Sequence, residues 1–108
     1  MKLNKTKKIK SDIVKEISEK TGIFQQDVKL IVNAFIESIR NNLLANHRIE
    51  IRNLGTFHTR VHRPKEIVDV NTGEKRVIGF RKKPKLKFGY DFSKMIEDNY
   101  TLDEIEDL

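Results

Sequence analysis

Apolar residues recur at helical spacing in the first half of the chain. Residues 11–22 are predicted to form a helix, with Ser11 as its N-cap and Gly22 as its C-terminal stop. Residues 25–47 are predicted to form a second, longer helix. Its apolar stripe consists of Val28, Ile31, Val32, Phe35, Ile39 and Leu43. Because Ile36 and Leu44 widen this stripe, the helix is expected to pack on more than one neighbour.

The period of the pattern changes to two in the second half. Residues 48–61 alternate in two runs, with Gly55 expected in a tight hairpin between them. Residues 81–88 alternate basic and apolar side chains, which predicts a strand with one wet basic face, although Pro84 would remove a ladder hydrogen bond. Residues 90–99 return to helical spacing. The pattern therefore predicts helices, then strands, then a helix.

Two further stretches carry turn and capping signals. The sequence "VDVNTGEKRV" (68–77) predicts a hairpin in which Asn71 and Thr72 form the bend and Gly73 takes the positive φ of a three-residue loop. A two-stranded hairpin is marginal on its own in water, so this one needs another surface to stabilise it. The sequence "TLDE" (101–104) is a capping-box pattern, which predicts either a separate short helix or a kink in the preceding helix.

Composition limits the class of protein. The 108 residues suit one domain, and a hydrophobic fraction of 37% is thin for a compact monomer, which indicates that a partner subunit completes the core. The absence of cysteine excludes a disulfide or a zinc–thiolate site. No apolar run approaches the roughly 20 residues of a membrane span and no signal peptide is visible, so a cytoplasmic protein without a membrane partner is expected.

The positive charge is concentrated in the middle of the chain. The formal net charge is +6, but residues 52–87 hold eleven lysines and arginines against three acids. Residues 1–10 hold five lysines and no acid, whereas residues 91–108 hold seven acids and one lysine. A cluster of this kind favours a polyanion as the partner over a merely solvated surface.

Five short motifs carry a resemblance to a known family. They are "EKTG" (19–22), "VNAF" (32–35), "GTF" (55–57), "NTG" (71–73) and "PKLKFG" (84–89). No single motif is specific, but their order and spacing resemble the HU/IHF family of bacterial histone-like DNA-architectural proteins. The number of residues between "GTF" and "NTG" also agrees with the arm of that family.

The resemblance implies an α+β fold and three regions of the chain. Residues 9–99 would form an HU/IHF-like domain, with two N-terminal helices, a three-stranded antiparallel sheet, a long β-arm over about residues 60–82, and a C-terminal helix. Two chains would intertwine into a dimer. Residues 1–8 are a basic extension, either a disordered tail or one in which Lys2, Lys5, Lys7 and Lys8 add phosphate contacts. Residues 100–108 are an acidic extension, either a solvating tail or a competitor of DNA.

The resemblance also assigns candidate residues. The phosphate-binding candidates are Arg52, Arg60, Arg63, Lys65, Lys75, Arg76, Arg81, Lys82, Lys83, Lys85 and Lys87. Each can replace a condensed counterion, and the alternative is a solvated surface, which weighs equally for Arg52. The expected dimer core consists of Val28, Ile31, Val32, Phe35, Ile39, Leu54, Phe57 and Leu86.

The arm tip is the point at which the chain departs from the family pattern. The expected tip consists of Val70, Asn71, Thr72 and Gly73, and Val70 stands where the family has a proline that wedges between base pairs. Val70 either acts as a weaker wedge or packs across the hairpin on the opposite strand. Bending of DNA is therefore expected to be weaker than is usual in the family.

The function implied is that of a dimeric, largely sequence-independent protein of the nucleoid. Its arms would embrace double-stranded DNA in the minor groove, bent, nicked or gapped DNA included, and would shape or compact it. A homodimer is expected, with a heterodimer as the alternative state. The alternative function is an HU-like fold adapted to RNA or to a protein partner.

Enzymatic activity is not expected. The chain has no cysteine nucleophile, no glycine-rich phosphate loop and no recognisable acid–base pair, so neither a small-molecule substrate nor a cofactor is predicted. His58 and His62 lie four residues apart, which spans roughly 13 Å in a strand and is too far for one ion. No metal site is predicted.

Overall fold

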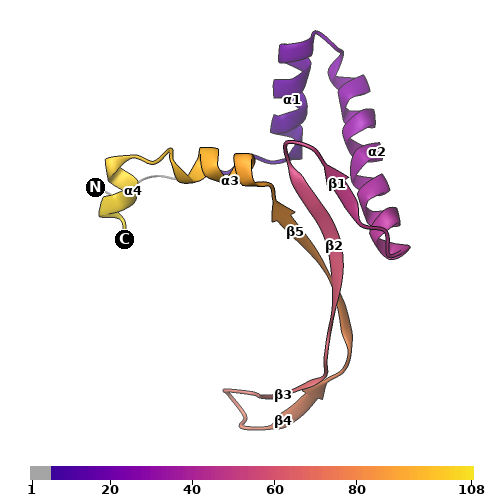
Figure 1. The fold of residues 1–108 in the computed structure, drawn as a ribbon, viewed down its shortest axis with the longest axis vertical. Helices are drawn as coiled ribbons and strands as arrows, with labels where there is room; N and C mark the ends of the chain where they lie inside the picture. Colours follow the sequence, from indigo (N-terminus) through magenta and orange to yellow (C-terminus); the bar gives the residue numbers. More distant parts are fainter. Residues whose placement is uncertain (1–5) are drawn as a thin grey trace.

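The computed structural model describes residues 6–108 and begins with two antiparallel helices (Figure 1). Helix α1 spans Lys10–Thr21. The predicted N-cap, Ser11, is wrong, because Ile9 occupies that position and its backbone N–H donates to the Asp12 carboxylate at 2.9 Å. The stop at Gly22 is confirmed. This glycine takes a left-handed φ of 76°, and its N–H donates to the Ser18 carbonyl.

Helix α2 (Gln25–Leu44) ends before the predicted residue 47. Asn46 takes a left-handed φ of 64°, and the N–H of His47 donates to the Asn42 carbonyl at 2.9 Å. Asparagine tolerates this conformation better than most residues, which explains why the helix stops at this point.

A three-stranded antiparallel sheet follows, in the order β1 (Ile49–Ile51), β2 (Gly55–His62), β5 (Arg81–Phe88). Gly55 is not the hairpin residue that was predicted. Asn53 turns the chain with a φ of 71°, and Gly55 starts β2 opposite Phe88. A Cβ at Gly55 would collide with the backbone of β5, so only glycine fits there. Strand β5 contains Pro84 as predicted, and it is one of the two edge strands of this sheet, where proline is tolerated.

Strands β2 and β5 lead into a long arm (Figure 1). The arm is the antiparallel hairpin of β3 (Lys65–Val68) and β4 (Lys75–Ile78), in the register Lys65 to Ile78. Between sheet and arm, Arg63 and Pro64 on one side and residues 79–80 on the other belong to no strand. The arm turns sharply away from the line of β2 and β5 at this point, because pairing is interrupted on both sides.

Two helices follow the sheet at the end opposite the arm (Figure 1). They are α3 (Tyr90–Glu97) and α4 (Leu102–Glu106). The capping-box prediction is confirmed in its first form, a separate short helix. The N–H of Thr101 donates to the Glu104 carboxylate at 2.9 Å, and the N–H of Glu104 donates to the Thr101 hydroxyl at 3.3 Å.

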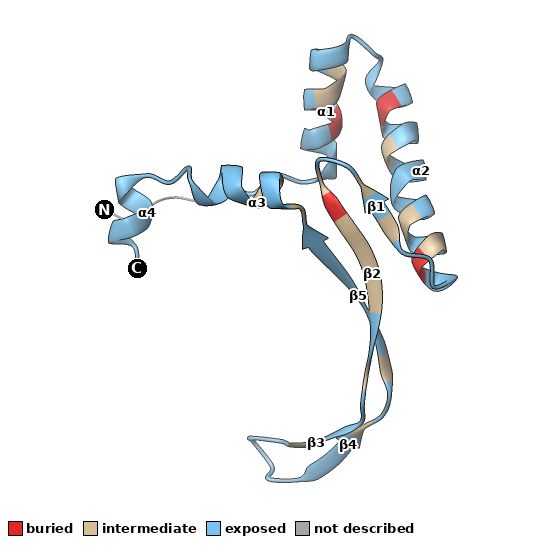
Figure 2. Cartoon of the chain, viewed as in Figure 1, coloured by how far each residue is buried: buried red, intermediate tan, exposed pale blue. Residues whose placement is uncertain are grey.

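Residues 6–108 form almost no core of their own (Figure 2). Only three hydrophobic side chains of the described residues are buried, namely Val14, Val28 and Leu43. The radius of gyration is 19.5 Å, against about 13 Å for a compact domain of 100 residues. None of the described helices is long and apolar enough to cross a membrane.

The predicted dimer core divides into three groups. Val28 is 2% exposed, so it already belongs to the core between α1 and α2 and leaves nothing for a partner to cover. Ile31 and Phe35 are 60% and 49% exposed, and Leu86 is also exposed. The remaining four are half-buried, namely Val32, Ile39, Leu54 and Phe57.

Candidate nucleic-acid interface

The sheet has two chemically different faces, which follow from its register. Directly opposed residues on antiparallel strands share a face, and successive residues alternate between faces. The pairs Phe57–Leu86 and Thr59–Pro84 therefore share one face. The other face carries a set that we call the basic face, namely His58, Arg60, His62, Arg81, Lys83, Lys85 and Lys87.

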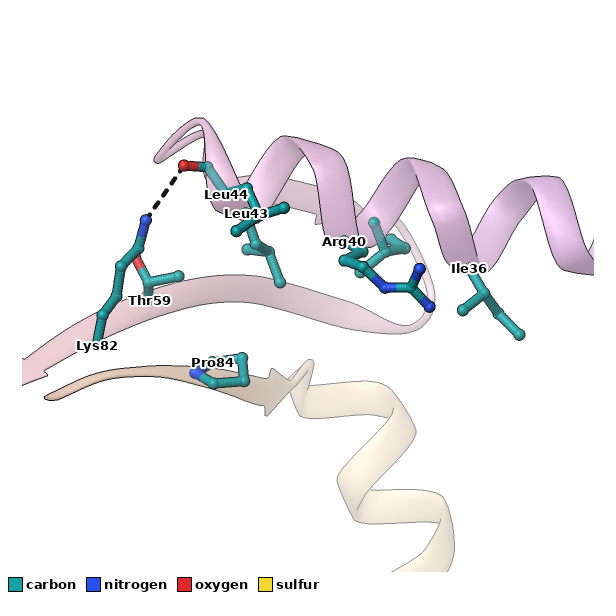
Figure 3. Close-up of a pocket in the computed structure, with 8 residues that line it drawn as sticks. Ile36, Arg40, Leu43, Leu44, Thr59, Lys82 and Pro84 are labelled. Atoms are coloured by element: carbon teal, nitrogen blue, oxygen red, sulfur yellow. Dashed lines mark hydrogen bonds between the residues drawn. The ribbon is translucent and has the colours of Figure 1, made fainter.

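The first face packs towards α2 across an apolar hollow of about 350 Å³ (Figure 3). The hollow is lined by Ile36, Ile39, Arg40, Leu43, Leu44, Thr59, Lys82 and Pro84. Lys82 was predicted to bind phosphate, but it lies on this side, and its Nζ donates to the Leu44 carbonyl at 3.3 Å. A cation at the last carbonyls of a helix is favourable, so Lys82 caps α2 and does not join the basic face.

The basic face carries no balancing acid. The ion pairs within residues 6–108 join Lys8 to Glu16, Arg48 to Glu50, Lys75 to Glu66, and Lys94 to Asp98. None of them involves a residue of the basic face. Arg60, Lys83, Lys85 and Lys87 are exposed, so their charges are available to an anion.

The pKa of His62 is affected by the positive charge of this face. Its pKa lies below its ordinary value of 6.5, first because burial penalises the charged imidazolium and then because Lys83, Lys85, Arg60 and Arg81 repel it. A cationic field of this kind at a half-buried imidazole is the environment that attracts phosphate.

The arm carries its charges on both faces. Lys65 and Arg76 share one face with Ile67, whereas Lys75 shares the other face with Glu66. The Lys75 Nζ lies 3.9 Å from the Glu66 carboxylate, so part of its charge is already balanced. The arm alone is therefore less basic than its lysine and arginine count predicts.

The arm tip is a four-residue loop, not the three-residue loop that was predicted. Gly73 takes the predicted positive φ, of 73°, and its N–H donates to the Asp69 carbonyl at 2.7 Å. The N–H of Asp69 donates to the Glu74 carbonyl at 2.8 Å and closes the loop. Val70 is 97% exposed, so it does not pack on the opposite strand.

Asp69 is a tip residue that sequence reasoning missed. Its carboxylate accepts the N–H of Asn71 at 2.8 Å, the geometry in which aspartate mimics a backbone turn. It was counted only as an acid within the basic stretch. The signal that could have identified it is an aspartate just before an Asn-Thr-Gly turn.

Other candidates lie away from the basic face. Arg52 is in the turn between β1 and β2, at the end of the sheet opposite the arm. Lys8 pairs with Glu16, and Lys2 and Lys5 lie outside the described residues.

Across residues 6–108 no group of three or more potential metal ligands comes together.

The family model and the similar proteins of known name agree on one family. Residues 8–97 match the family model described as bacterial DNA-binding protein. The chain is 36% identical over 84 residues to the integration host factor subunit alpha of Pseudoalteromonas translucida, covering 72% of this chain and 85% of that protein. It is 32% identical over 80 residues to DNA-binding protein HU of Lactococcus lactis, covering 74% and 88%.

Solved structures share the fold. An Anabaena HU–DNA cocrystal structure matches with a TM-score of 0.78 at 20% identity, over 82% of this chain and 97% of that chain. HU from Thermotoga maritima matches with a TM-score of 0.58 at 21% identity, over 82% and 98%.

Proposed function

The chain belongs to the bacterial DNA-binding protein family of HU and integration host factor, and we propose that two copies of it embrace duplex DNA and shape it. Membership makes it a DNA-binding architectural protein and favours DNA over RNA or a protein partner. The observation that carries the proposal is the segregation of the sheet, which leaves its basic face unpaired and open beside a long arm.

A second copy would complete the core. The α2 stripe is left open at Ile31 and Phe35, and the apolar hollow beside β5 is open as well. Hydrophobic surface of this extent is unusual on a monomer and common at obligate interfaces. An identical partner is the simplest state, because closed twofold dimers are the commonest oligomers, and a related subunit is the alternative.

Phosphate contacts would come from the basic face and from the free charges of the arm. Arg60, Lys83, Lys85 and Lys87 are the principal contacts, with Arg63, Lys65 and Arg76 extending them along the arm. Contacts of this kind carry little sequence information, so binding would be largely independent of sequence. Such a protein acts in the cytoplasm, on the nucleoid.

Val70 would meet the minor groove at the arm tip. Its exposed apolar side chain suits a wedge, but valine retains an N–H that needs a partner when it leaves water. Insertion would therefore be shallower than with proline, whose ring leaves no donor. The expected result is binding with weak bending.

The extensions that flank the domain of residues 9–99 would modulate binding. Lys7 of the basic N-terminal extension carries no ion pair within the described residues and could reach phosphate. Residues 100–108 end in the acidic helix α4, which would repel DNA that approaches it.

A binding assay on matched nucleic acids tests the proposed function. Fluorescence anisotropy would compare intact duplex, nicked duplex, gapped duplex and duplex RNA of the same length and salt concentration. We expect all DNA forms to bind more tightly than RNA, with the nicked and gapped forms at least as tight as intact duplex. Equal or tighter binding to RNA would contradict the proposal.

A further inference from the structure

His62 and Arg81 form the last pair of the sheet before the arm. They face each other across β2 and β5 on the basic face, and both are half-buried. Directly after this pair, residues 63–64 and 79–80 belong to no strand, so the pair lies at the base of the arm.

Both side chains contain a nitrogen atom that lacks a hydrogen-bond partner. Within the described residues, the Nε2 of His62 and the Nε of Arg81 are buried from solvent and bonded to nothing. Buried polar atoms are nearly always paired, so two unpaired nitrogens in one cross-strand pair would favour an added acceptor at this position.

The surroundings of the pair determine the charge of that ligand. His58 and Arg60 face it from β2, and Lys83 and Lys85 face it from β5. No carboxylate contributes to the field at His62. An anion with several acceptor oxygens, such as a phosphodiester, matches both the field and the orphan nitrogens.

We propose that His62 and Arg81 form a phosphate-binding site at the base of the arm, and that His62 takes up a proton when a DNA phosphate binds there. The inference rests on the proposed function. In the free chain, burial and then the neighbouring cations hold the pKa of the imidazole below its ordinary value, which favours the neutral form at pH 7. A bound phosphate offsets those cations and accepts a hydrogen bond from the imidazolium, which raises the pKa.

The sign of the pH dependence follows from linkage. Because the pKa of His62 is higher in the complex than in the free chain, the added affinity is fully present below the free pKa. It is lost as pH rises through the pKa of the complex. DNA binding should therefore tighten as pH falls, and each complex should take up protons.

The test is an anisotropy titration of a short DNA duplex at constant ionic strength, between about pH 5.5 and 8. The full chain is compared with His62→Gln, and with His47→Gln as the matched control. His47 lies at the end of α2, where its ring nitrogen contacts Asn42, away from the basic face. Calorimetry in two buffers of different ionisation enthalpy counts the protons taken up.

We expect wild type and His47→Gln to tighten by about tenfold or more over this range, and His62→Gln to tighten by less than about threefold. The proton uptake measured by calorimetry should be lower for His62→Gln than for wild type, and unchanged for His47→Gln. An unchanged pH slope or proton uptake in His62→Gln would overturn the inference while leaving the proposed function intact. Absence of DNA binding at every pH would overturn both.

Discussion

Lys82 and Lys83 are adjacent in sequence but lie on opposite faces of β5. Lys83 pairs with Arg60 on the basic face, whereas Lys82 donates to the Leu44 carbonyl on the α2 side. We therefore predict that Lys83→Ala weakens DNA binding through the loss of phosphate contacts. Lys82→Ala should leave the contacts in place and lower the free energy of unfolding.

The size of both effects follows from the contacts. Each phosphate contact adds about 0.9 to the slope of log affinity against log salt, so losing Lys83 from both chains of a dimer should reduce the slope by about 1.8. Between about 50 and 200 mM salt, wild type should then lose about 12-fold more affinity than Lys83→Ala does. Lys82→Ala removes a helix-end interaction worth about 0.3–1 kcal/mol.

The assay is anisotropy of a labelled duplex over a salt series, with urea unfolding of each variant as the measure of stability. We expect Lys82→Ala and wild type to have the same salt slope. Lys83→Ala should have a shallower slope. If Lys82→Ala and Lys83→Ala reduce the slope of log affinity against log salt equally, the two faces of β5 are not separated as described. The assignment of phosphate contacts by strand register is then refuted.

Three other predictions concern the dimer, the acidic end and the tip. If a second copy covers the half-exposed ring as proposed, Phe35→Ala should cost about 3–5 kcal/mol of unfolding free energy and make unfolding more dependent on protein concentration. A folded monomer of wild type at micromolar concentration, seen by sedimentation, would contradict this. Removing residues 100–108 should tighten DNA binding most at low salt, since exposed charges act over about 10 Å at 0.1 M; equal affinity across a salt series would reduce them to a solvating tail. Val70→Pro should increase the bend of a short duplex, measured by energy transfer between its ends, and an unchanged end-to-end distance at saturation would exclude a wedge.

Periodicity predicted the elements well where local chemistry decides their ends. Gly22 ends α1, and the Thr101 capping box starts α4, because each satisfies helix-end groups without help from distant residues. Ser11 failed as an N-cap because the helix begins at Lys10 and the Asp12 carboxylate accepts the N–H of Ile9, two residues before Ser11. The isoleucine side chain cannot cap a helix, so residue type favoured Ser11, and only the structure shows that Ile9 takes the position.

The candidate site was predicted as a set of charges but not as a surface. The count of lysines and arginines predicted that both Lys82 and Lys75 bind phosphate. In the structure, Lys82 caps α2 and Lys75 lies beside the Glu66 carboxylate. Lys82 turns towards α2 through the register of β2 with β5, whereas Lys75 comes beside Glu66 through the register of the β3–β4 hairpin. The first register is set by pairing between strands that residues 63–80 separate in the chain, and the second by a four-residue loop where a three-residue loop was predicted, so residue type alone gives neither.

Gly55 explains how the register that separates the faces is maintained. A shift of one residue between β2 and β5 would turn Lys83 and Lys85 into the apolar hollow and expose Leu86 to the anion. At the start of β2, the backbone of β5 comes so close that only a residue without a Cβ fits, and Gly55 is that residue. After such a shift, Thr56 or Leu54 would have to occupy the same place, and the side chain would collide with the backbone of β5. The close approach at one glycine thus keeps the basic side chains together on the basic face, away from the apolar hollow.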